Sequence, residues 1–165
     1  MSFFLCFIGF LNFGCGEKAA DTSQSAEPAQ EEVPTTGALA LRFAIDEDYA
    51  AIMDEPPAGT FYGSFWHSDD VDSLGPIEGA VAINVMEIEM DLPMDGSATE
   101  VLWTEEDLPV GEVYMLGFLD SDGNSDPENT NPDSKDPVTL PTESDFDVLG
   151  GETTEVTVMM SMLYP

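Results

Sequence analysis

Hydrophobic and polar residues alternate along most of the chain after position 37, and a period of two is the pattern of β-strands. Residues 38–45, ALALRFAI, show this pattern clearly, because every second side chain is large and apolar. The large set is Leu39, Leu41, Phe43 and Ile45. Alanines and Arg42 occupy the other face, so the pattern predicts a strand with one face in the core.

Residues 60–67 and 81–92 predict two further strands. The first, TFYGSFWH, alternates Phe61, Gly63 and Phe65 against Tyr62, Ser64 and Trp66. Bulky side chains on both faces predict a central or covered strand. In the second, the apolar positions are Val81, Ile83 and Val85, followed by Met86, Ile88, Met90 and Leu92. Because a shift by one residue turns every side chain to the opposite face, this change of phase predicts a bulge or a sharp bend near Val85.

The C-terminal half adds two apolar segments. Residues 113–119 are apolar at nearly every position, as expected of a strand buried on both faces. The last strand, TTEVTVMMSML, is expected to bury Val156, Val158, Met160 and Met162. Residues 46–55 favour one or two helical turns that Pro56 would end. Glycine and proline separate the short strands, so the predicted fold class is all-β, an antiparallel β-sandwich of about seven strands over residues 38–165.

The first residues of the chain have a different character. Residues 2–14, SFFLCFIGFLNFG, are apolar and uncharged. They are too few to cross a hydrocarbon core, which takes about 20 helical residues, but they fit the apolar part of a secretory signal peptide. Residues 16–37 are poor in apolar side chains, which is typical of a disordered tether. We therefore expect a signal peptide at 1–14 and a linker at 15–37.

Cys15 stands between these two segments, directly after Gly14. The arrangement resembles the signal of bacterial lipoproteins, in which a peptidase cuts before a cysteine that then carries lipid. The resemblance implies a lipid anchor on Cys15 and a place in the bacterial cell envelope, at the outer membrane or the periplasmic face. Cleavage would remove Cys6, so no intramolecular disulfide would remain. The alternative is an ordinary secretory peptide with a leftover cysteine, which would give a secreted protein.

The charge of the chain restricts its partners. The chain has 34 Asp and Glu residues and three Lys and Arg residues, which gives a formal net charge of −31. Binding to nucleic acid is excluded, because it depends on basic side chains that displace counterions from phosphates, and an anionic membrane surface would repel the folded part. So much like charge also destabilises the compact state by self-repulsion.

Leu119–Pro137, LDSDGNSDPENTNPDSKDP, is the most acidic stretch and lies between two apolar strands. Side-chain oxygens recur at every second position in Asp120, Asp122, Asn124 and Asp126, and Glu128, Asp133 and Asp136 follow. Calcium takes six to eight oxygen ligands, and these residues with backbone carbonyls would supply them. The loop is not an EF-hand, because Ser125 and Asn131 stand where that motif has Gly and Glu. The segment is therefore either a calcium site or a polar loop whose side chains bond their own backbone.

His67, the one histidine of the chain, precedes Asp69, Asp70 and Asp72 at a predicted strand end. Histidine and carboxylates at this spacing would bind zinc or act as an acid and base pair, whereas a simple strand-end loop is the alternative. We expect no enzyme, because a serine nucleophile would depend on this single histidine and no Gly-rich phosphate loop is present.

Residues 108–124, LPVGEVYMLGFLDSDGN, resemble the turn, central strand and acidic loop of transthyretin-like domains, a group of immunoglobulin-like sandwiches that includes carboxypeptidase-regulatory-like domains. FYGSFW with its central Gly63, followed by GPIEGAVAI, is similar to their early strands. The resemblance implies that Pro109 and Gly111 form a turn and that Tyr114 and Phe118 pack. The hydrolases of this fold need several His and Arg residues, and this chain has Arg42 as its one arginine.

Together these patterns predict an exported, lipid-anchored, acidic and non-enzymatic binding or structural module of the bacterial cell envelope. Its acidic loop is a candidate calcium site, with the polar loop as the alternative. A protein, a carbohydrate and simple surface display all remain open as its role, and the sequence leaves the oligomeric state undefined. The alternative function is a small hydrolase or metal-dependent enzyme that uses His67, Asp69 and Asp70.

Overall fold

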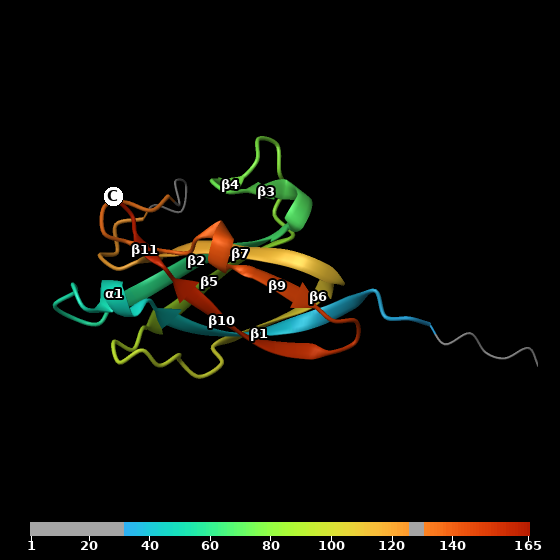
Figure 1. Cartoon of the computed structure of the whole chain (residues 1–165), viewed down its shortest axis with the longest axis horizontal. Helices are drawn as coiled ribbons and strands as arrows, with labels where there is room; N and C mark the ends of the chain where they lie inside the picture. Colours follow the sequence, from blue (N-terminus) through green and yellow to red (C-terminus); the bar gives the residue numbers. More distant parts are fainter. Residues whose placement is uncertain (1–31, 126–130) are drawn as a thin grey trace, which may run out of the picture. The chain divides into compact units, whose positions relative to one another are not determined.

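The chain folds into the all-β antiparallel sandwich that the alternation predicts (Figure 1). The computed structural model describes residues 32–125 and 131–165, and Glu32–Pro165 forms one compact unit. Seven of the described strands have four or more residues, in agreement with the expected number. They are β1 (Thr36–Ile45), β2 (Ala58–His67), β5 (Asn84–Asp91), β6 (Trp103–Pro109), β7 (Gly111–Asp120), β9 (Asp145–Val148) and β10 (Thr153–Met160).

Short elements complete the described part. Four strands of two residues each are β3 (Val71–Asp72), β4 (Gly75–Pro76), β8 (Pro137–Val138) and β11 (Met162–Leu163). The helical elements are α1 (Glu47–Ala50) and the 3-10 turns η1 (Ser68–Asp70) and η2 (Pro141–Glu143). The side chain of Asp46 caps α1 by accepting a hydrogen bond from the Asp48 amide, which confirms the helical turn expected before Pro56. Within the described ranges no helix is long and apolar enough to span a membrane.

Sheet A contains three strands in the order β10, β1, β6. β1 is antiparallel to β6 but parallel to β10, so this one pairing departs from the antiparallel pattern. Strand β10 begins its pairing with β1 at Thr153 opposite Ala38 and continues to Met160 opposite Ile45. Parallel neighbours need a long crossover connection, and here residues 46–152, which include β2 to β9, lie between β1 and β10.

Sheet B has the order β11, β8, β7, β2, β5, and β9 pairs with the first part of β7 beside β8. β2 lies between β5 and β7 with long antiparallel ladders on both sides, which confirms the predicted central strand. The two sheets are joined at Val110, the single residue between β6 and β7. Gly111 follows with φ 123°, so the turn expected at Pro109 and Gly111 is present.

The core lies between the facing sides of the two sheets. Sheet A contributes the predicted face of β1, whose four large side chains are at most 1% exposed. Sheet B contributes Phe61, Phe65, Met115 and Leu119, which are fully buried. The rings of Phe43 and Phe61 meet across the two sheets with centroids 5.0 Å apart. From β10, Val158 and Met160 are fully buried and Val156 is partly buried, and Met162 of β11 is also partly buried.

Two glycines opposite one another make room for the core of sheet B. Gly63 of β2 is paired with Gly117 of β7. A Cβ atom on Gly117 would lie 2.5 Å from Cζ of Phe61 and 2.5 Å from the backbone oxygen of Tyr62. A Cβ atom on Gly63 would lie 2.4 Å from Cε of Met115. The Phe61 ring therefore packs over a surface that only glycine leaves free.

Of the bulge or sharp bend predicted near Val85, the bend is present at Ile83 and the bulge is absent. β5 pairs with β2 in an unbroken register from Asn84 to Asp91. Val81 and Val85 are 75% and 73% exposed, so neither belongs to the core face whose phase seemed to change. The bend at Ile83 lies just before β5 begins. Val81 in the connecting segment and Val85 on the exposed face of β5 therefore gave the sequence an apolar alternation that does not correspond to a core face.

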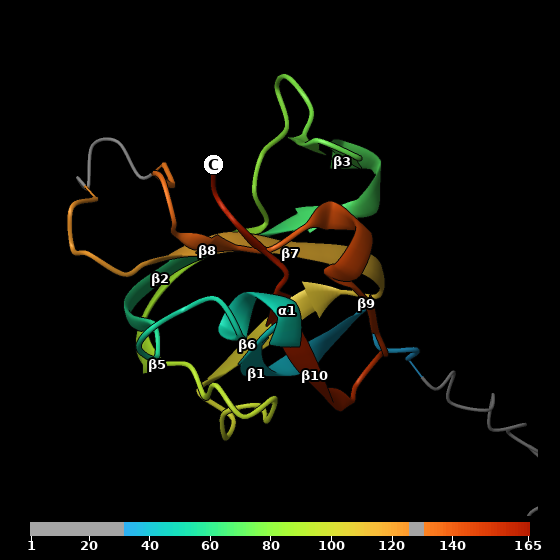
Figure 2. The same cartoon turned by 60° about the vertical axis from the view of Figure 1, so that its left-hand side comes forward.

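The segment 68–83 projects from sheet B on the side away from sheet A (Figures 1 and 2). It contains the β3–β4 hairpin, whose turn places Leu74 at the tip with 93% of its surface exposed. The amide of Leu74 donates a 2.8 Å hydrogen bond to Oδ1 of Asp72, which stabilises the turn. The acidic loop leaves sheet B at the end of β7, where Asp120 is paired with Thr60 near the start of β2.

Replacing Gly117 with alanine tests the packing of Phe61. We expect Gly117→Ala to lower the free energy of unfolding by about 1–3 kcal/mol, because the added Cβ meets both a core ring and rigid backbone. Ser64→Ala is the matched control on β2, where a change of about 0.5 kcal/mol or less is expected. Urea denaturation measures both, and equal effects of the two variants would contradict this packing.

Candidate functional site

Asp120 organises the start of the acidic loop. It is the last residue of β7 and only 3% exposed. Its Oδ1 accepts hydrogen bonds from the amides of Gly123 at 2.8 Å and Asn124 at 3.2 Å, and its Oδ2 accepts one from the amide of Ser125 at 3.0 Å. Gly123 has φ 72°, a left-handed conformation that lets the chain turn back over the carboxylate. The backbone of residues 121–125 therefore wraps around one buried carboxylate.

The hydrogen bonds decide the charge of Asp120. Burial alone would raise its pKa, because a desolvated carboxylate favours the neutral form. The amides of Ser125, Asn124 and Gly123, with the Ser125 hydroxyl, outweigh this effect and bring the pKa below the ordinary value for aspartate. Asp120 is consequently held as an anion inside the loop.

Asp136 closes the same loop from its other end. It is 2% exposed, and its carboxylate accepts hydrogen bonds from the amides of Ser121 at 3.3 Å and Asp133 at 3.0 Å. Two backbone bonds of 2.8 Å join this segment to the end of the chain, from Lys135 N to the carbonyl of Tyr164 and from Tyr164 N to the carbonyl of Asp136. Both ends of the loop are thus fixed to sheet B.

The pKa of Asp136 is shifted in the opposite direction to that of Asp120. Burial raises the pKa of Asp136, and the negative charges of Asp133 and Asp120 raise it further, against the opposing amide bonds. A raised pKa makes the ionised form of Asp136 costly at neutral pH. The stabilising contribution of Asp136 is therefore complete below the ordinary pKa of about 3.9 and is lost as the pH rises through the raised value.

An amide group lies between two other carboxylates of the loop. Nδ2 of Asn124 donates hydrogen bonds to Oδ2 of Asp122 at 2.9 Å and to Oδ2 of Asp133 at 2.6 Å. The remaining Oδ1 of Asp133 is buried without a hydrogen-bond partner. Within residues 32–125 and 131–165, the ion pair found is Arg42 with Glu155, 2.7 Å apart, and none of the loop carboxylates is paired with a basic side chain.

A chain of hydrogen bonds links five of the seven predicted metal ligands, Asp120, Asp122, Asn124, Asp133 and Asp136. Asp126 and Glu128 lie outside the described residues. Among the residues that are described, no three His, Cys, Asp or Glu side chains converge as a group that could hold a metal ion. The hydrogen bonds of Asp120 and Asp122 to their own loop are those of the polar-loop alternative.

The second predicted cluster is spread along the base of the projecting segment. His67 is the exposed last residue of β2, and its side chain makes no hydrogen bond or ion pair with any described residue. Asp69 and Asp70 belong to η1, and Asp72 serves the turn at Leu74. Nothing in this part of the structure orients the imidazole toward a reacting group.

A third acidic site was not predicted from the sequence. A surface groove with a volume of about 410 Å³ lies at the end of β5 and is rimmed by Glu89, Asp91 and Glu100. The sequence did contain a signal for two of them, because VMEIEMD alternates buried and acidic positions. Glu100 carries no such signal, since only the path of residues 92–102 brings it to β5.

The comparisons give no family for this chain. No protein-family model, no curated protein and no solved structure matches it. The geometry of the acidic sites is thus the basis on which their function is argued.

Replacing the central carboxylate of the loop tests its structural role. We expect Asp120→Asn to lower the free energy of unfolding at pH 7 by about 2 kcal/mol, because an amide leaves one of three buried N–H groups unpaired. The lowered pKa means that the contribution of Asp120 is present above about pH 3.9 and is lost as the pH falls through its folded-state value. Urea denaturation should therefore show a difference between variant and parent that narrows below pH 3.9.

The exposed Asp147 of β9 provides the control. Asp147→Asn should change stability by about 0.5 kcal/mol or less at any pH. A pH-independent cost of Asp120→Asn, or a cost equal to that of the control, would contradict the role of Asp120 as a buried anion.

Proposed function

We propose that this chain is an exported, non-enzymatic binding or structural module of the bacterial cell envelope, anchored through lipid on Cys15. The observation that carries the proposal is the set of hydrogen bonds that the Asp120 carboxylate accepts from its own loop. This carboxylate is committed to three backbone amides, so it shapes a surface loop instead of facing a substrate. A preorganised loop fixed to a sheet at both ends is the arrangement by which β-sandwiches present binding surfaces.

The proposed membership among transthyretin-like domains is supported by the order of elements in residues 108–124. A turn at Val110, the long strand β7 and the acidic loop follow one another as the resemblance implies. Phe118 is 5% exposed and its ring lies 5.5 Å from that of Tyr62, whereas Tyr114 is half-buried. The lipid anchor rests on Cys15 and its flanking segments, which lie outside the described residues.

We further propose that calcium stabilises the acidic loop. The supporting observation is the Asn124 amide, whose NH2 group bridges the carboxylates of Asp122 and Asp133 as a positive group would. If the side-chain amide of Asn124 rotated by half a turn, its oxygen would face the carboxylates of Asp122 and Asp133 in place of the NH2 group. A cation bound between these groups would then have three oxygen ligands. The unpartnered Oδ1 of Asp133 is a fourth candidate ligand.

The competing function is a small hydrolase or metal-dependent enzyme built on His67, Asp69 and Asp70. It would require partners that hold the imidazole in one orientation. The described residues supply none, so we favour the binding role. An activity that Asp69→Asn and His67→Ala both abolish, with the fold unchanged, would reverse this preference.

The anchor is tested at the mature N-terminus. We expect mass spectrometry of the protein purified from bacterial membranes to show a chain that begins at Cys15 and carries acyl groups on that residue. Cys15→Ala should leave an uncleaved and unacylated chain. A mature chain cut elsewhere, or an unmodified Cys15, would refute the anchor.

Calcium binding is tested by thermal unfolding with calcium and with a chelator. We expect calcium to raise the melting temperature of the parent by several degrees, since binding to the folded state alone stabilises it. The double variant Asp122→Asn, Asp133→Asn should lose this increment, because it removes the two carboxylates that Asn124 bridges.

Asp145→Asn, Asp147→Asn on β9 is the matched double control. It removes the same number of charges from an exposed strand and should keep the full increment. Calcium would have no place in this loop if the parent melted at the same temperature under both conditions.

A further inference from the structure

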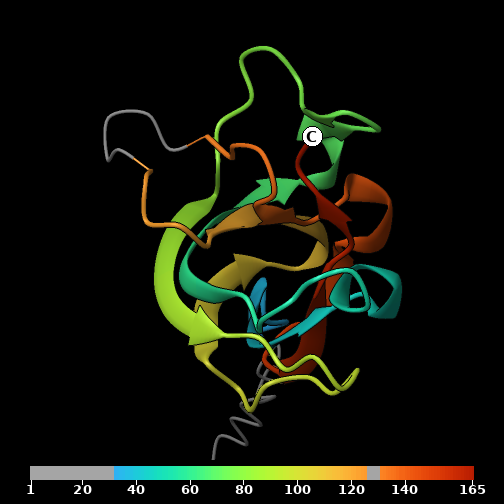
Figure 3. The same cartoon turned by 90° about the vertical axis from the view of Figure 1, so that its left-hand side faces the viewer.

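β5 forms one edge of sheet B. Among the described residues it pairs with β2 alone, so the peptide groups along its other side have no neighbouring strand. Figure 3 shows this strand, in yellow-green, along the border of the sheet. Its outward-facing residues Val85, Glu87, Glu89 and Asp91 alternate with buried Met86, Ile88 and Met90. An exposed edge with regular alternation is a template to which a further strand can be added.

The groove at the end of β5 is lined by apolar and acidic residues, and its three carboxylates are called the rim below. Met90, Pro93 and Leu102 supply apolar surface, and Glu89, Asp91 and Glu100 supply three carboxylates. Met90 is 6% exposed and belongs to the core, which fixes this part of the lining. Such a lining suits a long side chain with an apolar stem and a positive end, that is, lysine or arginine.

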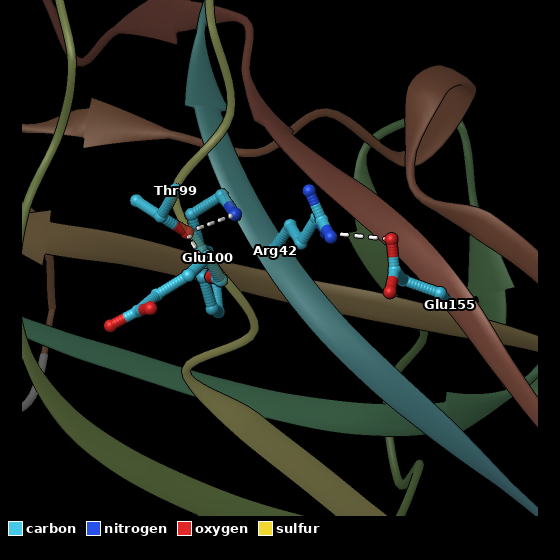
Figure 4. Close-up of polar contacts among 5 residues, drawn as sticks. Arg42, Thr99, Glu100 and Glu155 are labelled. Atoms are coloured by element: carbon cyan, nitrogen blue, oxygen red, sulfur yellow. Dashed lines mark hydrogen bonds and ion pairs between the residues drawn. The ribbon is translucent and has the colours of Figure 1, made fainter.

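Two contacts hold the rim in position. The hydroxyl of Thr60 donates a 2.5 Å hydrogen bond to Oε1 of Glu89. Thr99 is tied to β1, because its amide donates to the carbonyl of Phe43 at 2.8 Å and its Oγ1 accepts from the amide of Phe43 at 3.0 Å. The same hydroxyl donates to the carbonyl of Glu100 at 2.7 Å, so Glu100 follows a fixed segment (Figure 4).

The rim carries its charge without compensation. Figure 4 shows the carboxylate of Glu100 pointing away from Arg42, whose guanidinium is paired with Glu155. No described Lys, Arg or His forms an ion pair with Glu89, Asp91 or Glu100. Among the described residues no basic side chain complements this groove, so its carboxylates are free to pair with a positive group from outside.

The net charge of the chain decides which partner supplies that positive group. A second copy would bring the same acidic edge and a formal charge of −31, so pairing of β5 with itself is opposed by repulsion. We propose that the free edge of β5 binds an extended, lysine- or arginine-rich segment of another protein as an added strand. One basic side chain of that segment enters the groove and meets Glu89, Asp91 and Glu100.

Strand addition accounts for both features of the site. Backbone hydrogen bonds to β5 supply affinity that does not depend on the partner's sequence, and the groove supplies the preference for a basic residue. Because side chains in a strand alternate, only every second residue of the partner has to be basic. This inference deepens the proposed binding role, on which it rests, but its test uses a soluble peptide and is independent of lipid on Cys15 and of calcium.

The probe is a synthetic peptide of about ten residues in which lysine and valine alternate, a pattern that favours an extended strand. Its control has the same sequence with N-methyl groups on every backbone amide, which keeps the charge and removes the hydrogen-bond donors from both edges of the strand. We expect the full chain to bind the first peptide in isothermal titration calorimetry and the second at least about tenfold more weakly, because the methyl groups remove several backbone bonds. Hydrogen exchange should slow in residues 84–91 when the first peptide is bound.

Two charge-matched variants locate the site. Glu89→Gln, Glu100→Gln should weaken peptide binding about fivefold, as expected for the loss of two exposed ion pairs. Glu112→Gln, Glu143→Gln removes the same charge from exposed positions on β7 and η2 and should leave binding unchanged.

Four results would overturn the proposal. Equal binding of both peptides would show attraction by net charge alone, and equal losses in the two double variants would show the same. Self-association of the chain that protects residues 84–91 without any peptide would make a second copy the occupant. Failure of the peptide to bind a chain whose Cys15 is acylated would refute this inference and leave the envelope role intact.

Discussion

Burial of apolar side chains between the two sheets has to outweigh the mutual repulsion of the acidic surface. The chain carries 34 acidic and three basic side chains, and one ion pair is formed among the described residues. Surface attraction therefore contributes little to the fold, and the stabilising energy comes from the core. Each buried phenylalanine contributes about 2 kcal/mol. Phe43, Phe61 and Phe65 are fully buried, and the glycine pair Gly63 and Gly117 allows the Phe61 ring to sit there.

The division between an apolar inside and an acidic outside also explains what the sequence could predict. Alternation identified β1 and β2, because a period of two reports directly which face is buried, and a continuous apolar run identified β7. β6, with the sequence WTEEDLP, escaped prediction because it is an edge strand whose side chains are mostly exposed. β9 has only four residues, DFDV, and its pairing with β7 is set by tertiary contacts. The parallel pairing of β1 with β10 joins segments that are far apart in the sequence, and no local pattern encodes it.

The candidate sites divide in the same way. The position of the acidic loop was predictable, since its composition marks it as a surface connection between strands. The separate roles of its acids were not, because Asp120 and Asp122 look equivalent in sequence while one is buried under three amides and the other is exposed. Similarly, the groove at β5 depends on the segment between β5 and β6, because the path of that segment places Glu100 beside the end of β5. Distance in sequence hides such neighbours, and the fold brings them together.

The dependence of stability on salt tests the balance of core against repulsion most directly. Screening shortens the reach of surface charges from about 10 Å at 0.1 M salt to about 3 Å at 1 M, and leaves the apolar core in place. Urea denaturation in increasing sodium chloride should therefore show the free energy of unfolding rise steadily, with the slope of the transition against urea unchanged. A free energy that falls or stays constant with salt would contradict an account in which a buried apolar core holds together a mutually repelling acidic surface.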